Sequence, residues 1–193
     1  MIEKEPIHRL SLFGLDEYFN ELANLFHLDK LPSKVLLSGQ KGLGKSTLVH
    51  HFINYILSKE EEYSYDRVNF KINSKNQSFI TMSNKSNINF SLIDVNSENK
   101  SIDINQIREL ILRLNKSSFN NKPRFILIDN IEFLNVNSVN ALLKILEEPS
   151  SNIYFFLINN NKKVLPTLLS RCINFKISLN NNDIREITNR LLD

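Results

Sequence analysis

The chain has one cysteine, no tryptophan and four glycines among its 193 residues. The single cysteine, Cys172, excludes an intrachain disulfide and a cysteine-cluster zinc site, so no zinc is expected. No apolar run is long enough to cross a bilayer, and no N-terminal segment resembles a signal peptide, which favours a cytoplasmic protein without a membrane partner. Neither charge dominates, because 24 basic and 21 acidic side chains give a net charge of +3. This balance does not indicate nucleic-acid binding by itself.

Three of the four glycines fall in one short segment with the spacing of a phosphate-binding loop. An apolar run at 35–37 precedes the segment and a helical pattern follows it, which is the context that the motif requires. Backbone N–H groups and the helix N-terminus would face the phosphates of ATP. Lys45 would reach the β- and γ-phosphates, and the Ser46 hydroxyl would coordinate Mg²⁺. The predicted nucleotide-binding residues are Gly39, Gln40, Lys41, Gly42, Leu43, Gly44, Lys45, Ser46 and Thr47.

Apolar runs alternate with helical patterns along the rest of the chain. Strands are predicted at 36–38, 90–95, 125–129, 153–158 and 173–177, and helices at 15–28, 45–58, 104–114, 139–146 and 184–192. The polar segment at 63–88 predicts irregular or hairpin structure with a short strand at 68–72. The alternation predicts an α/β fold, a parallel sheet with helices on both faces and ligands at the carboxyl ends of its strands.

A second acidic residue is expected at the nucleotide. Asp129 closes the predicted strand at 125–128 and is the candidate carboxylate for Mg²⁺. Hydrolysis also needs a group that orients or deprotonates the attacking water. The next residue is Asn130, which cannot accept a proton, and Glu132 lies three residues beyond Asp129. The residues alone therefore predict a nucleotide-binding module with weak or absent ATP hydrolysis of its own.

Five blocks between about Leu10 and Ile177 resemble the AAA+ subunits of the bacterial DNA polymerase III clamp loader. The blocks are LFGLD at 12–16, LPSKVLLSG at 31–39, SIDINQIR at 101–108, NSVNALLKILEEP at 137–149 and LPTLLSRC at 165–172. The delta-prime type is most similar and the gamma/tau type comes second. The resemblance implies a P-loop AAA+ core over 1–178 and the start of a helical lid over 179–193, with the chain ending inside the first lid helix.

The resemblance also implies roles for single residues. Arg171, in the SRC block, would be an arginine finger that reaches the ATP of a neighbouring subunit, and a planar, permanently charged guanidinium suits that role. The family's sensor falls at Asn159, or one residue on at Asn160. Glu147 and Glu148 lie at the C-terminal turn of a predicted helix, where the helix dipole disfavours carboxylates, and this hints at a basic partner.

The implied partners are the other clamp-loader subunits (gamma/tau and delta), the sliding clamp indirectly, and primer-template DNA within the assembly. The implied location is the nucleoid-associated replisome, as part of the DNA polymerase III holoenzyme. Asn130 stands where gamma/tau-type subunits carry Glu, which favours the delta-prime type. Residues 59–100 replace the four-cysteine zinc module of many relatives. An active gamma/tau-type ATPase, a small P-loop phosphotransferase and a nonfunctional remnant stay open as alternatives.

Overall fold

The computed structural model describes residues 5–95, 101–116, 120–147, 152–179 and Ile187. The chain divides into two compact units. The first unit takes in residues 1–31, 40–86 and 177–193, and the second takes in residues 32–39 and 87–176.

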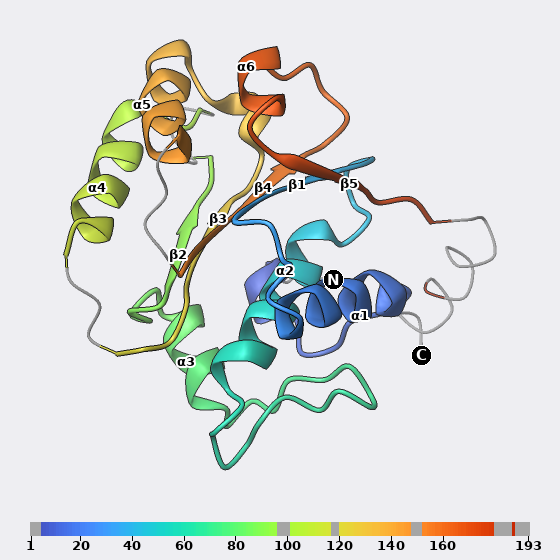
Figure 1. Cartoon of the computed structure of the whole chain (residues 1–193). Helices are drawn as coiled ribbons and strands as arrows, with labels where there is room; N and C mark the ends of the chain where they lie inside the picture. The colour runs from blue at the N-terminus through green and yellow to red at the C-terminus, as the bar shows by residue number, and fades with distance from the viewer. Residues whose placement is uncertain (1–4, 96–100, 117–119, 148–151, 180–186, 188–193) are drawn as a thin grey trace. The chain divides into compact units, whose positions relative to one another are not determined.

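The second unit is built on a five-stranded parallel sheet (Figure 1). Its strands are β1 (Lys34–Ser38), β2 (Phe90–Ile93), β3 (Arg124–Ile128), β4 (Ile153–Asn159) and β5 (Ile173–Lys176), in the order β2-β3-β4-β1-β5. The register places Leu36 of β1 opposite Leu157 of β4, and Ile126 of β3 opposite Phe155 of β4. Because the strands all run in one direction, their carboxyl ends meet at one edge of the sheet.

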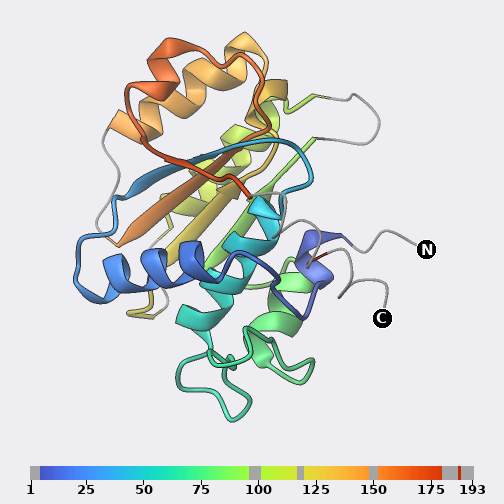
Figure 2. The ribbon, with the colours of Figure 1, turned by 90° about the vertical axis from the view of Figure 1, so that its right-hand side faces the viewer.

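Helices of the second unit pack on this sheet (Figure 2). They are α4 (Ile104–Leu114), η2 (Ile131–Phe133), α5 (Val136–Glu147) and α6 (Pro166–Leu169). Ile107, Leu142 and Leu168 from the helices join Leu36 and Phe155 from the strands in one buried core. The predicted start of α4 is confirmed, because the Asp103 side chain accepts hydrogen bonds from the Asn105 and Gln106 N–H groups and forms a capping box with Gln106.

The first unit contains η1 (Pro6–His8), α1 (Asp16–His27), α2 (Lys45–Leu57) and α3 (Gln77–Ser83). Phe19 of α1 is fully buried in an aromatic cluster. Its ring stacks on Tyr65 with centroids 5.2 Å apart and meets the edge of Phe70 at 5.4 Å. Such ring pairs add to the stabilisation from burial alone. This cluster joins α1 to the segment that follows α2.

The predicted strand at 68–72 is wrong. Asp66 and Lys71 instead form an isolated antiparallel bridge that closes a tight turn, and the Asp66 carboxylate accepts the Val68 and Asn69 N–H groups, each at 3.0 Å. The turn uses the preference of aspartate for bonding backbone two residues ahead. The same segment also holds α3, which was not predicted from the sequence. Asn76 caps α3 by accepting the Phe79 N–H at 2.8 Å.

Residues after the sheet contact α1 within the first unit. The Tyr18 hydroxyl donates to the Ser178 carbonyl at 3.0 Å and accepts the Ser178 N–H at 3.1 Å. Gly14 has a φ of +67°, and a Cβ there would lie 2.3 Å from Cδ1 of Ile187. Glycine therefore fits this position both by conformation and by space. Ile187 is the one described residue of the predicted helix at 184–192, whose other residues, like most of the predicted lid at 179–193, lie outside the described residues.

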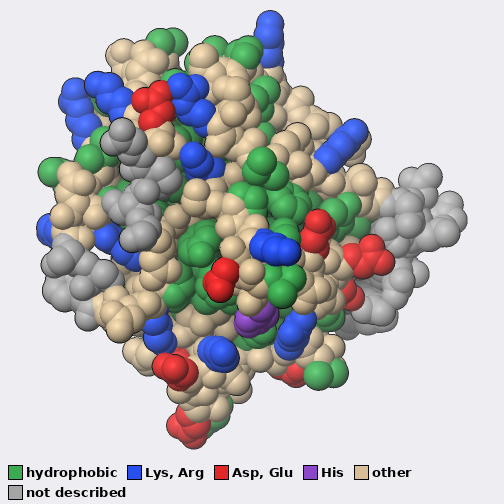
Figure 3. All heavy atoms as spheres, viewed as in Figure 1, with side chains coloured by type: hydrophobic (Ala, Val, Ile, Leu, Met, Phe, Trp, Pro, Cys, Tyr) green, Lys and Arg blue, Asp and Glu red, His purple; other side chains and the backbone are tan. Residues whose placement is uncertain are grey.

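The remaining predicted strands and helices are confirmed within about two or three residues at each end, and with them the predicted α/β fold. Among the helices that the structure describes, none is long and apolar enough to cross a membrane. On the face shown in Figure 3, basic and acidic side chains are interspersed, in keeping with the net charge of +3.

Two buried histidines of α2 make stability depend on pH. His50 and His51 are 3% and 0% exposed, and burial lowers the pKa of His50 to about 3 and that of His51 to about 4. An unfolded histidine has a pKa of about 6.5, so below that pH the unfolded chain binds more protons than the native one. Stability is therefore full above about pH 6.5 and falls as the pH decreases towards 4.

Urea unfolding between pH 7 and pH 5 should thus show a free energy of unfolding that falls, below pH 6.5, by up to about 1.4 kcal/mol per pH unit for each of the two histidines. The variant His51→Gln should have a shallower slope. His27 is an exposed histidine of α1, and His27→Gln serves as the matched control that keeps the slope of the original protein. A pH-independent unfolding free energy over this range would contradict the prediction.

Candidate functional site

The predicted phosphate-binding loop begins at Gly39, directly after β1, and leads into α2. Gly42 and Gly44 have φ angles of +89° and +80°, a region that side chains other than glycine rarely adopt. Gly44 is the N-cap of α2, and a Cβ there would lie 3.2 Å from Cδ1 of Leu15. The backbone of this loop therefore depends on glycine at both positions.

Lys45 begins α2 and is buried, with an exposed fraction of 3%. Its Nζ donates to the Gln40 carbonyl at 2.6 Å, so the ammonium is folded back against the loop's own backbone. By contrast, Lys41 at the tip of the loop is exposed. A buried ammonium beside a helix N-terminus is a donor set that suits phosphate oxygens. The loop and the buried Lys45 therefore suit a nucleoside triphosphate. That residues 39–47 bind it, with Ser46 as a ligand of Mg²⁺, stays a prediction.

Polar side chains gather at the carboxyl ends of three neighbouring strands in the second unit. Asp94 follows β2, Asp129 and Asn130 follow β3, and Asn159 and Asn160 lie at the end of β4. Because β2, β3 and β4 are adjacent in the sheet, these side chains come from one stretch of its edge. This is the edge at which open α/β sheets place their ligands.

Asn130 lies at the centre of this group. It adopts a left-handed conformation with φ +56°, which asparagine tolerates better than most residues. Its Nδ2 donates to Oδ1 of Asp94 at 2.7 Å, and its Oδ1 accepts Nδ2 of Asn160 at 2.8 Å. Gln106 of α4 donates to the Asp94 carbonyl at 2.9 Å. One amide therefore joins the ends of β2, β3 and β4.

Glu132, the other carboxylate near this position, holds Asn160. Its Oε1 accepts Nδ2 of Asn160 at 3.1 Å, and its Oε2 accepts the Asn160 N–H at 3.4 Å. Asn159, the predicted sensor, instead bonds to a local turn, with Nδ2 donating to the Lys162 carbonyl at 3.0 Å. Of the two asparagines at the end of β4, it is thus Asn160 whose side chain enters the network. The sensor role of Asn159 stays a prediction.

Asp129 is nearly buried, with an exposed fraction of 9%. Its Oδ1 accepts the N–H of Asn130 at 2.8 Å, and its own N–H donates to the Ile93 carbonyl at 2.9 Å. These bonds fix the end of β3 and the direction of the carboxylate. Ser46 belongs to the first unit and Asp129 to the second, so their joint coordination of Mg²⁺ stays a prediction.

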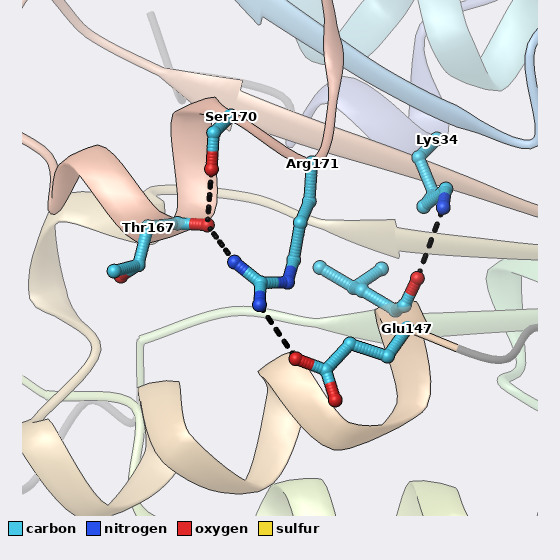
Figure 4. A network of polar contacts seen from close by, with 6 residues as sticks. Lys34, Glu147, Thr167, Ser170 and Arg171 are labelled. Carbon is cyan, nitrogen blue, oxygen red and sulfur yellow. Dashed lines mark hydrogen bonds and ion pairs between the residues drawn. The ribbon is translucent and has the colours of Figure 1, made fainter.

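Arg171 follows α6 and is partly exposed, with an exposed fraction of 31% for its side chain. Its Nη1 donates to the Thr167 carbonyl at 2.8 Å, and its Nη2 is paired with Oε1 of Glu147 at 2.5 Å (Figure 4). The guanidinium is therefore neither enclosed in the core nor free of intramolecular contacts. Glu147 thus has a basic residue of its own chain beside it. The interaction of the two glutamates with a basic partner stays a prediction. Glu148 lies outside the described residues.

Cys172, the next residue, is partly buried, and burial raises the pKa of its thiol to about 11. The nearby ammonium of Lys34 opposes this rise without cancelling it. Since the thiolate is the reactive form, this cysteine is a poor nucleophile at neutral pH. It is a packing residue at the edge of the core of the second unit.

Sequence reasoning missed Asp94 and Gln106 and left the geometry of Glu132 and the choice of Asn160 undecided. Asp94 carries the same signal as Asp129, an acidic residue directly after an apolar run. The signal indicates that Asp94 belongs to the site only when β2 is known to lie beside β3. The sequence does not give the strand order.

The matching family model and the curated relatives agree on one family. The family model described as "DNA polymerase III, delta subunit" matches residues 14–181. DNA polymerase III subunit gamma/tau of Mycoplasma genitalium is 28% identical over 171 residues, which cover 88% of this chain and 27% of that protein. DNA polymerase III subunit delta' of Buchnera aphidicola is 28% identical over 162 residues, which cover 83% of this chain and 47% of that protein. The chain thus spans less than half of these relatives.

A solved structure shares the fold. The DNA polymerase III gamma subunit-related protein of Thermotoga maritima aligns with a TM-score of 0.59 and 18% identity, and the alignment covers 88% of this chain and 49% of that one. The likeness confirms the α/β fold and carries no further argument. Because the gamma/tau and delta' relatives are equally identical to this chain, identity does not separate the two types.

Lys45→Ala should abolish ATP binding, since it removes the buried ammonium that the loop offers to the phosphates. Lys41→Ala is the matched control, because it removes an exposed lysine from the same loop and should change the ATP dissociation constant by less than about 3-fold. Isothermal titration of the purified chain with ATP and Mg²⁺ measures both. An unchanged ATP affinity in Lys45→Ala would reject this loop as the nucleotide site.

Proposed function

Because this chain belongs to the DNA polymerase III delta subunit family, we propose that it is the AAA+ core of a clamp-loader subunit of the delta-prime type. In this proposal it assembles with gamma/tau and delta subunits that open the sliding clamp and place it on primer-template DNA. Its own part is to complete the ATP site of a neighbouring subunit. The chain binds ATP and Mg²⁺ through residues 39–47 but hydrolyses ATP weakly or not at all.

The observation that carries the proposal is the neutral side chain at position 130, Asn130. A catalytic carboxylate is needed there to act on the attacking water, and Asn130 supplies a neutral amide. That amide is engaged on both sides, with Asp94 and with Asn160. Glu132, the carboxylate that could have replaced it, accepts two hydrogen bonds from Asn160. The loop suits phosphates, but the position that would activate the attacking water lacks a base. This combination favours ATP binding without ATP hydrolysis.

Arg171 supports the second half of the proposal. Its guanidinium carries five N–H donors, of which one is bonded to Thr167 and one to Glu147 within the described part of the chain. Among the described residues no partner is recorded for the other three, and the partly exposed side chain would let phosphate oxygens of a neighbour reach them. Arginine stabilises the charge that develops on a transferring phosphoryl group when it is supplied from an adjacent subunit. We assign Arg171 this role of an arginine finger in trans.

An active gamma/tau-type ATPase is the second candidate, favoured by the complete phosphate-binding loop and by a gamma/tau relative at 28% identity. The two candidates differ in the fate of ATP bound to this chain. No observation favours the small-molecule phosphotransferase over either of them.

The purified chain should therefore show no steady ATP turnover above background, although it binds ATP. A coupled-enzyme assay with Mg²⁺ measures this, and Lys45→Ala serves as the background control because it removes the phosphate ligand. Steady hydrolysis that disappears in Lys45→Ala would favour the gamma/tau-type ATPase and reject the delta-prime assignment.

Arg171→Ala should lower the DNA- and clamp-stimulated ATPase rate of a reconstituted clamp loader by about 10²-fold or more, since fingers supplied in trans have effects of that size. Circular dichroism of the variant chain should be unchanged, because Arg171 lies outside the buried core. Arg108→Ala, which removes an exposed arginine of α4, is the matched control. An unchanged ATPase rate in the Arg171→Ala loader would remove the finger assignment.

A further inference from the structure

The contact between Arg171 and Glu147 points to a role that the proposed finger does not by itself include. We infer that Glu147 is a positioning residue: its carboxylate holds the Arg171 guanidinium in the orientation that engages a neighbouring nucleotide. The inference rests on the proposed function of Arg171 and adds a residue to it. Glu147 is the last residue of α5, and Arg171 lies 24 residues later, just after α6, so the contact joins two segments of the second unit.

Glu147 occupies a place that a lone carboxylate would avoid. It is the last residue of α5, where the partial negative charge of the helix C-terminus repels an acidic side chain. Two cationic side chains lie close to this negative end of the helix. Arg171 pairs with the Glu147 carboxylate, and Nζ of Lys34 donates to the Leu146 carbonyl at 3.0 Å (Figure 4). Lys34 therefore anchors the last turn of α5, and Glu147 extends from an anchored end towards Arg171.

The Arg171 guanidinium is hydrogen-bonded through both of its terminal nitrogens, Nη1 and Nη2. Nη1 donates to the carbonyl of Thr167 in α6, four residues earlier, while Nη2 donates to Glu147 of α5. The Thr167 carbonyl also accepts the Ser170 hydroxyl at 3.1 Å, which fixes the acceptor in turn. With Thr167 alone, the planar group could rotate about its single anchor. A second anchor on another element sets the plane of the group, and with it the direction of the three remaining N–H donors.

Holding the side chain in advance has a kinetic consequence. A long arginine side chain loses rotamer freedom when it engages a phosphate, and a pre-ordered one loses less. The contribution is modest, because the two side chains are 31% and 55% exposed and water screens their attraction. The loss of Glu147 should therefore weaken the finger without abolishing it.

In a reconstituted clamp loader, Glu147→Ala should lower the stimulated ATPase rate by about 3- to 5-fold. Glu147→Gln keeps an acceptor oxygen without the charge and should restore part of this loss. In the Arg171→Ala loader, Glu147→Ala should have no further effect, since a positioning residue acts only through the group it holds. Glu109→Ala is the control, because it removes an exposed carboxylate from α4 of the same unit and should leave the rate unchanged.

Each other outcome of this cycle overturns the inference. A higher rate in Glu147→Ala would mean that the carboxylate competes with the phosphate for the finger. An equal loss from Glu147→Ala in the original loader and in the Arg171→Ala loader would mean that Glu147 acts on the fold. If Arg171→Ala lowers the rate and Glu147→Ala does not, the finger stands and the positioning role falls.

A second measurement does not depend on ATPase activity. Side-chain ¹⁵N spectra of the purified chain should show slow rotation of the Arg171 guanidinium, identified by its loss in Arg171→Lys, and faster rotation in Glu147→Ala. Equal rotation in both proteins would refute positioning even if the finger itself is confirmed. Restricted rotation together with an unaffected Arg171→Ala loader would instead refute the proposed function and leave the ion pair as a purely structural contact.

Discussion

The double hydrogen bonding of one amide side chain, Asn130, is the constraint on which the candidate site depends. An amide can donate and accept at once, so Asn130 donates a hydrogen bond to Asp94 and accepts one from Asn160. An ionised glutamate could only accept, and it would stand beside Asp94 and Glu132 as a third negative charge. The bonds that join the ends of three strands thus favour the same neutral residue on which the proposal of weak or absent hydrolysis rests.

Much of the fold could be predicted, because its strands are almost continuous apolar runs and its long helices have an apolar face with a recognisable start. Asp103 at the start of α4 is one such signal, and its side chain caps the helix. The segment after α2 could not be predicted in the same way. Its β-branched and aromatic residues at 68–72 suggested a strand, but Asp66 draws the backbone into a turn and Phe70 adopts a left-handed conformation. Local side-chain bonds overrode propensity there.

The candidate site was predictable where a single stretch of chain carries it and not where distant segments meet. The glycines and Lys45 of the loop are neighbours in sequence, so their pattern was sufficient to predict a glycine-dependent loop between β1 and α2. Asp94 and Asn130 are 36 residues apart and meet only because β2 pairs with β3. Glu147 meets Arg171 because α5 and α6 pack in one core. Family resemblance supplied the proposed role of Arg171 but none of its contacts.

The protonated thiol of Cys172 affects how the protein can be labelled with cysteine reagents. With a thiol pKa of about 11, only a minute fraction is ionised at neutral pH, so alkylating probes react with this sulfur slowly. Because no other cysteine exists in the 193 residues, a reporter cysteine installed on an exposed surface could be labelled selectively. Fluorescence studies of subunit association could then proceed in the native background, without replacing the residue adjoining Arg171.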